Sequence, residues 1–391
     1  MTDPLMHRNN LYTRRHAIGL GAVGLAALAG LPGCGDDDSS GTSTAASAGS
    51  DSFEGETLNL FTWASYHDKP WLAEYEKSRG VKVNVQLYGG VPDGFAKVQA
   101  NPEAFDIVLP TSGWVETYVA ADLLVPIDEG RIPNLKNVTD ELAWRDATEV
   151  DGTNYAVLYN WGDEPLCWLP SEVDTLTSWE SLYDPALAGK VSLVDDPTTV
   201  MPFIPIMLGF PDPFNLDEAQ FQEMSDALMD LRGQVTHVSA SIEDQTADFA
   251  NGQVTAGVLY NVSTQVALRD DGIELEQTIP DEGAAAWSDN YAITKAGEAK
   301  SDLVYDFIDY TLSIPWQARF AALSSNTSVL TLANAESPEA VKAGLDKEAL
   351  DRTLLPFTED GAAFFDQLKL LQQVPNLDEW LDLWNQFKTG L

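Results

Sequence analysis

Residues 58–109 read LNLFTWASYHDKPWLAEYEKSRGVKVNVQLYGGVPDGFAKVQANPEAFDIVL and alternate short apolar runs with longer mixed segments. Residues 81–88 (VKVNVQLY) alternate apolar and polar side chains with a period of two, which is typical of a half-exposed strand. Residues 105–109 (FDIVL) form a short apolar run that suits a buried strand. Helices are expected at 69–79 and 93–100. This strand–helix–strand order predicts a mostly parallel sheet with helices on both faces.

The alternation continues through the rest of the chain. A strand is expected at 155–160, and residues 190–194 (KVSLV) begin a second α/β series. That series is expected to continue with helices at 216–231 and 242–251 and strands at 235–238, 254–260 and 290–294. After the last strand only helices are expected, at 301–312, 315–323 and within 361–391. Two series with a late return strand predict an α/β fold of two lobes, a ligand cleft between them and a helical C-terminus.

The lobe boundaries follow from the same pattern. Residues 53–158 are predicted to form lobe 1, and residues 289–322 are predicted to return to it. Residues 159–288 are predicted to form lobe 2, with the helical tail 323–391 packing on it.

The N-terminus has the features of a targeting segment. Arg14 and Arg15 precede an apolar run at 17–33, and the run ends in Leu-Pro-Gly before Cys34. A basic region, an apolar region and a small-residue site predict a signal peptide over residues 1–34, and the paired arginines indicate the twin-arginine (Tat) route. The run is shorter than the roughly 20 strongly apolar residues of a spanning helix.

The end of this segment resembles the lipobox of bacterial lipoproteins, which implies that Cys34 is acylated and anchors the chain to a membrane. An uncleaved anchor helix is the alternative. Residues 35–52 follow, and over 35–51 they carry no large apolar side chain, so they are predicted to form a disordered tether. Either reading places the body outside the cytoplasmic membrane.

The charge of the chain excludes some partners. Its 22 Lys and Arg against 61 Asp and Glu among 391 residues give a formal net charge of -39. No basic face could neutralise the phosphates of a nucleic acid, so none is expected as a partner. The acids are spread along the whole chain. This favours a surface adapted to high salt, with an ordinary acidic protein as the alternative.

Motifs for chemistry are few. Only His67 and His237 remain beyond the targeting segment, and Cys167 stands between Leu166 and Trp168, which suggests a buried thiol. The sequence contains no metal-binding cluster, no G-x-S-x-G motif, no phosphate loop and no dinucleotide fingerprint. We therefore expect no enzyme activity, no cofactor and no metal.

Five stretches in order carry a family resemblance. They are 58–66 (LNLFTWASY), 105–112 (FDIVLPTS), 177–197 (TSWESLYDPALAGKVSLVDDP), 251–261 (NGQVTAGVLYN) and 287–294 (WSDNYAIT). Together they resemble the spermidine/putrescine-binding members of the periplasmic solute-binding proteins. The resemblance implies a type II periplasmic-binding-protein-like fold that closes on a polyamine. It also implies delivery of that ligand to the permease and ATPase of an ABC transporter.

The resemblance assigns residues to ligand binding. Trp63 and Tyr66 match an aromatic pair in the first strand–helix turn. Trp287 and Asp289 match a Trp-x-Asp motif, in which the aspartate binds an amine and the tryptophan stacks on it. Tyr260 stands where the family often has tryptophan.

The remaining positions match less closely. Ser112, in a Pro-Thr-Ser segment, is assigned to the ligand, but Gly113 occupies the position of the family's tyrosine. Asp196 either binds the ligand or caps a helix that begins at Pro197. Thr199 stands where the family has a second acid.

Other residues are candidates for the missing contacts. Asp163 or Glu164 supplies the absent charge under one hypothesis, and both are surface acids under the other. Gln372 or Gln373 matches a glutamine of the family. The alternatives for function are the same receptor class with another amine, an amino-acid derivative or a phosphonate, or a secreted lipoprotein enzyme or sensor on this fold.

Overall fold

The computed structural model describes residues 53–391 except for residues 65, 68, 88, 325, 326, 348 and 350–360. These residues belong to one compact unit, residues 50–391. The predicted signal peptide, the predicted acylation site at Cys34 and the predicted tether lie outside the described residues. None of the described helices is long and apolar enough to cross a membrane.

The first sheet contains the segments that the opening stretch of sequence predicts. Its strands run in the order β12-β11-β3-β1-β2, and β6 pairs with β11 off this path. Strand β1 is parallel to both β2 and β3, and helices α1 and α2 connect them. The bounds are β1 Thr57–Thr62, α1 Lys69–Arg79, β2 Lys82–Leu87, α2 Val91–Ala100, β3 Ile107–Val108, β6 Ala156–Glu164, β11 Ala284–Ile293 and β12 Leu368–Leu370. The predicted parallel strand–helix units are therefore confirmed.

The second sheet has the order β10-β7-β9-β8. Its elements are β7 Leu166–Trp168, β8 Val191–Ser192, α4 Pro197–Val200, α5 Phe203–Met207, α6 Glu218–Leu231, α7 Ile242–Ala250, β9 Ala256–Val258, α8 Val262–Asp270 and β10 Glu276–Thr278. The strand predicted at 235–238 is wrong. A short 3₁₀ turn at Arg232–Gln234 precedes that segment, and only one backbone bridge forms, between Val194 and Ser239.

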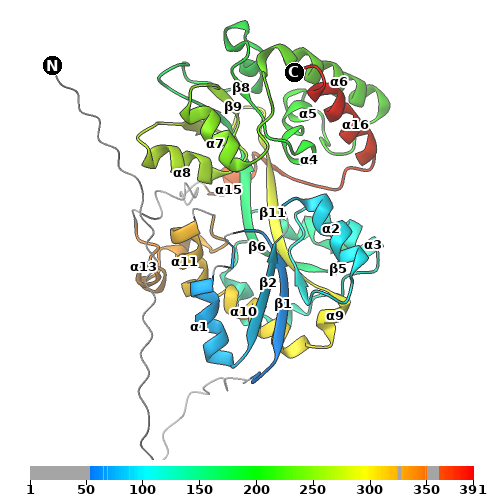
Figure 1. Ribbon diagram of the computed structural model, residues 1–391, viewed down its shortest axis with the longest axis vertical. Coiled ribbons are helices and arrows are strands. Elements are labelled where there is room, and N and C mark those ends of the chain that lie inside the picture. The colour runs from blue at the N-terminus through cyan, green and yellow to red at the C-terminus, as the bar shows by residue number, and fades with distance from the viewer. Residues whose placement is uncertain are drawn as a thin grey trace, which may run out of the picture. The chain divides into compact units, whose positions relative to one another are not determined.

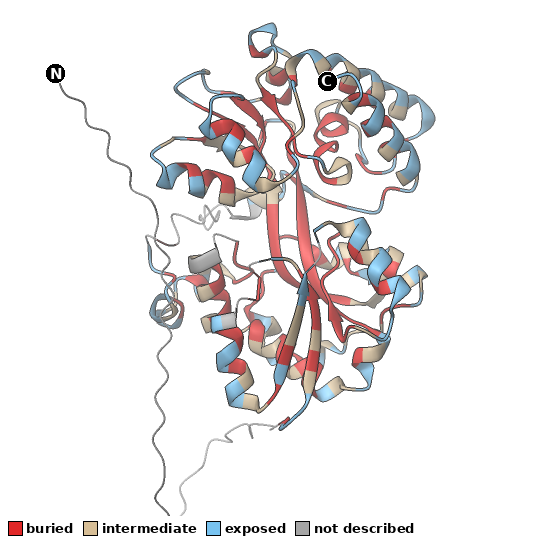
Figure 2. Cartoon of the chain, viewed as in Figure 1, coloured by how far each residue is buried: buried red, intermediate tan, exposed pale blue. Residues whose placement is uncertain are grey.

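Two long strands link the sheets. Strands β6 and β11 are antiparallel from Ala156 opposite Ala292 to Glu164 opposite Ala285, and β6 continues through Pro165 into β7. Figure 1 shows this pair running from the first sheet towards the second. Every residue of β11 is buried, as the red strand in Figure 2 shows. The α/β fold with two sheets joined by more than one crossing segment matches the prediction.

The C-terminal part is mostly helical. Its elements are α9 Lys295–Glu298, α10 Ser301–Thr311, α11 Ile314–Ser324, α12 Leu332–Ala335, α13 Pro338–Ala343, α15 Gly361–Phe365 and α16 Leu377–Lys388. The expectation of helices alone is wrong at β12, which pairs in parallel with Ala284–Ala286 of β11. Helix α16 packs on α4 and α6, whereas α13 packs on α11. The residue boundaries of the two lobes stay a prediction.

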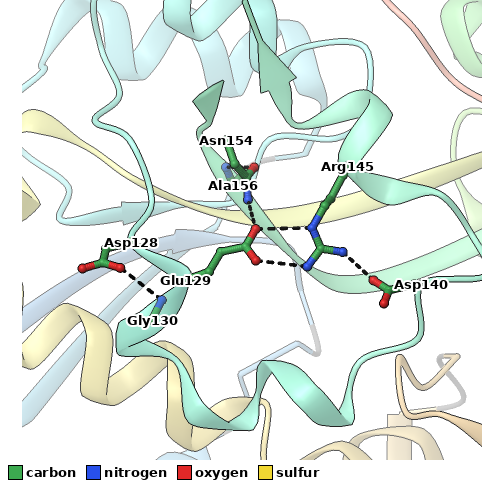
Figure 3. A network of polar contacts seen from close by, with 7 residues as sticks. All are labelled: Asp128, Glu129, Gly130, Asp140, Arg145, Asn154 and Ala156. Carbon is green, nitrogen blue, oxygen red and sulfur yellow. Dashed lines mark hydrogen bonds and ion pairs between the residues drawn. The ribbon is translucent and has the colours of Figure 1, made fainter. Parts of the chain in front are cut away.

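One arginine organises the connection between β3 and β6. This connection contains α3 Val115–Ala120, β4 Glu149–Val150, β5 Thr153–Asn154 and short 3₁₀ turns at Glu129–Arg131, Pro133–Asn137 and Trp144–Ala147. Arg145 donates to both carboxylate oxygens of Glu129 and to Asp140, and Asn154 donates to the same Glu129 (Figure 3). The guanidinium also lies 4.2 Å from the ring centre of Trp144. Two carboxylates and an aromatic face are thus held by one of the few cations of the chain.

His67 is buried and bonded to two hydroxyl groups of the core. Its Nδ1 lies 3.1 Å from the hydroxyl of Thr62 and its Nε2 lies 2.6 Å from the hydroxyl of Tyr291. Burial lowers the pKa of His67 from 6.5 to about 3. The ring is therefore neutral at physiological pH and belongs to the core below β1 and β11.

Candidate functional site

A cavity of about 340 Å³ collects residues from elements of both sheets. Its lining comprises Trp63, Ala64, Tyr66, Val91, Thr111, Asp196, Thr199, Ile242, Glu243, Tyr260, Asn261, Ser263, Trp287 and Asp289. Six of the seven residues predicted to bind ligand are among them. The exception is Ser112.

Strand ends explain why these side chains meet. Trp63 follows β1, Thr111 follows β3, Asp196 follows β8 and Tyr260 follows β9. Each of them lies just beyond the carboxyl end of a strand in a parallel pair. Ligands of open α/β sheets bind outside these carboxyl ends.

Asp289 is the most constrained acid of the cavity. The residue is only 3% exposed. Thr111 donates to its Oδ1 at 2.6 Å, and Tyr66 donates to its Oδ2 at 2.5 Å. Burial raises the pKa of Asp289 to about 6, although hydrogen bonds from Thr111, Tyr66 and Trp63 oppose this rise. Within the described part of the chain no basic side chain pairs with it, so its charge is left without a counter-ion.

The hydroxyl of Tyr66 is fixed in position by further contacts. It accepts a hydrogen bond from Nδ2 of Asn160 at 2.8 Å, and Tyr159 donates to the backbone carbonyl of Tyr66 at 2.9 Å. The ring packs edge-on against Phe320 with centroids 5.5 Å apart. Tyr66 therefore presents a preorganised donor to Asp289.

Trp287 lies directly against the backbone of β6. It is paired with Gly162 in the strand register, and a Cβ atom at residue 162 would lie 2.4 Å from Cζ2 of the indole. Only glycine at 162 permits this close approach. The indole thus forms a flat apolar floor beside Asp289, two residues along the same strand.

Asp196 and Tyr260 form a hydrogen-bonded pair in the cavity wall. Tyr260 donates to Oδ2 of Asp196 at 2.9 Å, and the hydroxyl of Thr198 donates to Oδ1 at 3.1 Å. Asp196 occupies the N-cap position of α4, but its side chain accepts no backbone hydrogen bond there. The helix-capping interpretation of this carboxylate is therefore wrong for its side chain, which lines the cavity.

Ser112 lies outside this cavity because it pairs with β11. Its amide donates to the carbonyl of Ser288 at 2.7 Å, and its hydroxyl accepts from the amide of Ser288 at 3.1 Å. It lines an adjoining cavity of about 190 Å³, together with Gln372 and Gln373. Gly113 has a φ of +82°, and a Cβ atom there would lie 2.6 Å from the carbonyl oxygen of Gln372. A tyrosine at position 113 would be strained and would clash.

Residues 71–348 match the model of a family described as bacterial extracellular solute-binding protein. The chain belongs to this family. It is 26% identical to the spermidine/putrescine-binding periplasmic protein 1 of Haemophilus influenzae, over 72% of this chain and 76% of that protein. It is also 26% identical to the putrescine-binding periplasmic protein of Escherichia coli, over 70% of this chain and 77% of that protein.

Solved structures share the fold of this solute-binding protein. The spermidine/putrescine transporter substrate-binding protein of Streptococcus pneumoniae superposes with a TM-score of 0.70 at 20% identity, over 86% of this chain and 99% of that one. A lipoprotein of Treponema pallidum gives a TM-score of 0.70 at 20% identity, over 85% and 99% of the two chains. At these identities the likeness establishes the fold alone.

Some lining residues of the solute-binding protein were missed from the sequence. Thr111 adjoins the predicted Ser112 and donates to Asp289, so the segment after β3 was identified from the sequence but Thr111 itself was not. Asn261 caps α8 by accepting from the amide of Ser263 at 2.9 Å, a helix-start signal that is visible in the sequence. Glu243 is an exposed acid in the first turn of α7, and nothing local distinguishes it from other surface acids.

The two acids proposed to replace the missing charge do not line the cavity. Asp163 and Glu164 are the last two residues of β6. Burial raises the pKa of Asp163 to about 6. In the strand pairing Asp163 lies opposite Ala286 and Glu164 lies opposite Ala285 of β11.

Proposed function

We propose that this protein is the substrate-binding component of an ABC uptake transporter and that it binds a polyamine, such as putrescine or spermidine, in the cavity around Asp289. The observation that carries this proposal is the charge of the lining. Its ionisable side chains are Asp196, Glu243 and Asp289 together with the tyrosines, and the lining contains no Lys, Arg or His. A buried carboxylate that only neutral groups contact is suited to an ammonium ion.

The aromatic side chains suit the rest of such a ligand. Trp63, Tyr66, Tyr260 and Trp287 surround the same cavity. Methylene groups of a polyamine would pack on these rings, and a desolvated ammonium over an aromatic face gains about 2 kcal/mol. The carboxylate of Asp289 would accept hydrogen bonds from the ammonium group.

The relatives support an amine over other ligands. The matched proteins of Haemophilus influenzae and Escherichia coli are named for binding spermidine or putrescine. An amino-acid derivative or a phosphonate would bring an anion towards the three acids of the lining without a basic side chain to pair with it. The family consists of solute-binding proteins, which supports a transport receptor over an enzyme or sensor.

The location of the protein is part of the proposal. The family is described as extracellular. We infer export by the twin-arginine route and anchoring through an acylated Cys34, on the basis of the N-terminal sequence. Cys34→Ser is expected to release the protein from the membrane fraction, and retention of the variant would contradict the anchor.

Ligand-induced stabilisation tests the binding function. The melting temperature of the purified protein is measured with putrescine, cadaverine, spermidine, glutamate and a phosphonate. A ligand at about 100 times its Kd stabilises the native state by about 2.7 kcal/mol. Only the amines are expected to raise the melting temperature, and Asp289→Asn is expected to remove the effect while Ser112→Ala keeps it. A shift with glutamate or the phosphonate alone would refute the polyamine ligand and leave the receptor class in place.

A further inference from the structure

Glu164 is a buried carboxylate without a hydrogen-bond partner. The residue is 2% exposed, and neither Oε1 nor Oε2 has a partner among the described residues. Burying a carboxylate in this way is among the costliest arrangements that a fold can contain. A missing cationic partner would account for it.

The register of β6 and β11 places Glu164 on the same strand face as the cavity residues. Gly162 is opposite Trp287, and Glu164 is opposite Ala285, two residues further along both strands. Directly paired residues share a face of the sheet and residues two apart lie on the same face. Trp287 and Asp289 line the cavity, so Glu164 points to their side.

Asp163 has the opposite orientation. It is opposite Ala286, between the residues that point towards the cavity. Successive side chains of a strand point to opposite faces. Of the two adjacent acids, only Glu164 is therefore oriented towards the ligand.

Glu164 also adjoins the Asp196–Tyr260 pair of the cavity wall. The charges of Asp196 and Asp163 add to burial in raising the pKa of Glu164. Burial raises the pKa of the Tyr260 hydroxyl, and the charges of Asp196, Glu164 and Asp289 add to this rise. Tyr260 thus lies near three carboxylates, of which Asp196 and Asp289 line the cavity and Glu164 lies outside its lining.

The spacing suits a ligand with two ammonium groups. Asp289 is four positions along β11 from Ala285, the partner of Glu164, which corresponds to roughly 13 Å along the strand. Trp287 is halfway between them. An alkyl chain lying over this indole would direct one end to each carboxylate, since both side chains reach inward.

We propose that Glu164, together with Asp196, binds the second ammonium group of the ligand, while Asp289 binds the first. This inference rests on the proposed amine-binding function and deepens it. Glu164 would take over the role of the acid that the sequence lacks at Thr199. It would make the site selective for diamines over monoamines.

Binding to Glu164 has a consequence for protons. Burial and the neighbouring charges of Asp196 and Asp163 favour the protonated carboxyl in the empty site. An ammonium group at hydrogen-bond distance favours the ionised form. The second ammonium group is therefore expected to lower the pKa of Glu164 and to promote proton release, whereas a monoamine held at Asp289 leaves Glu164 unaffected.

The experiment compares Glu164→Gln with Asp163→Asn, its neighbour on the other face. Affinities for putrescine and for butylamine are measured by calorimetry at pH 7.5. Glu164→Gln is expected to weaken putrescine binding by about 30-fold or more, the effect of removing one partner of a buried charge pair. Butylamine binding is expected to be unchanged in both variants, and Asp163→Asn is expected to bind putrescine like the parent protein.

The possible results separate the two proposals. Unchanged putrescine affinity in Glu164→Gln, or an equal loss for putrescine and butylamine, would overturn the role of Glu164 and leave amine binding in place. A parent protein that binds neither amine would overturn both proposals. Calorimetry in two buffers of different ionisation enthalpy is the second readout, with proton release on putrescine binding expected in the parent and reduced in Glu164→Gln. The variant removes an unpartnered buried acid, so it is expected to melt no lower than the parent.

Discussion

Amine binding should weaken in mild acid because Asp289 must be ionised to hold an ammonium group. Its pKa in the empty site is about 6. If only the ionised form binds, the apparent Kd rises by about twofold at pH 6 and about 11-fold at pH 5 relative to its limit at high pH. The ligand does not contribute to this change, since an alkylammonium with a pKa near 10 stays charged throughout.

The assay is a calorimetric titration of putrescine at pH 7.5, 6.5, 5.5 and 5.0. Asp163 and Glu164 also have raised pKa values, so the loss from Asp289 alone is a lower limit for the parent protein. Butylamine, which would contact Asp289 but not Glu164, isolates the 11-fold effect. An affinity for butylamine that is constant from pH 7.5 to 5.0 would refute the assignment of Asp289 as the ammonium acceptor.

The same carboxyl makes an opposite contribution to the stability of the empty protein. Its folded-state pKa of about 6 exceeds the ordinary value of 3.8, so the folded state holds the proton more tightly. The stability that Asp289 contributes is present at low pH and is lost as pH rises from 3.8 through 6. The total loss is about 3 kcal/mol, of which about 1.4 kcal/mol falls between pH 5 and pH 7.5. Asp289→Asn should remove this loss of stability, which is measured by urea unfolding at pH 5 and pH 7.5. If the free energy of unfolding of the variant changed between the two pH values as much as that of the parent, the raised pKa of Asp289 would be contradicted.

Three further predictions concern packing, the core and the surface. Gly162→Ala should displace the indole of Trp287 and weaken putrescine binding at least tenfold, as measured by calorimetry. The control Gly233→Ala, with open space around its Cβ position, should bind putrescine like the parent. Equal putrescine affinities of Gly162→Ala and the parent would contradict the stacking role of Trp287. The free energy of unfolding of the parent should fall by about 2 kcal/mol between pH 7 and pH 5, because the folded-state pKa of His67, about 3, lies below the unfolded value of 6.5. Urea unfolding of His67→Gln should not show this fall, and a fall of equal size in the variant would place its origin elsewhere. The melting temperature should rise between 0.1 and 3 M salt, because screening reduces the repulsion among charges that sum to -39, and a flat or falling trend would remove the argument for adaptation to high salt.

Elements with a local signal were predicted well from the sequence. The stretch from 58 to 109 carries period-two and helical patterns that match β1, α1, β2, α2 and β3 within a few residues. The Trp-x-Asp motif led to Trp287 and Asp289, which do line the cavity. These features depend on short segments whose own residues determine their conformation.

Elements that depend on distant partners were not predictable in the same way. Strand β12 has three residues, and it is a strand only because Ala284–Ala286 of β11 lie beside it. Segment 235–238 has apolar residues in a strand-like pattern but finds only one bridge, after a 3₁₀ turn. In both segments the presence or absence of a neighbouring strand, rather than the local sequence, decides whether a strand forms.

Asp163 and Glu164 illustrate why a site needs register as well as composition. In the sequence they are adjacent acids among 61, and no property of their own separates them. A shift of one residue in the pairing of β6 with β11 would exchange their faces. The close approach of Trp287 to Gly162 fixes that register, because the indole fits only where no Cβ atom is present.

The charge of the whole chain and the charge of the site have different meanings. Among the described residues the only buried acids are Asp106, Glu164, Asp248 and Asp289, so the number of acids mainly reflects the surface. Asp289 and Glu164 are buried, and burial destabilises their ionised forms in the empty protein. A sequence retains such acids against their cost in stability where a cation relieves it, so their burial next to a cavity without basic side chains is a stronger argument for an amine ligand than any count of acids.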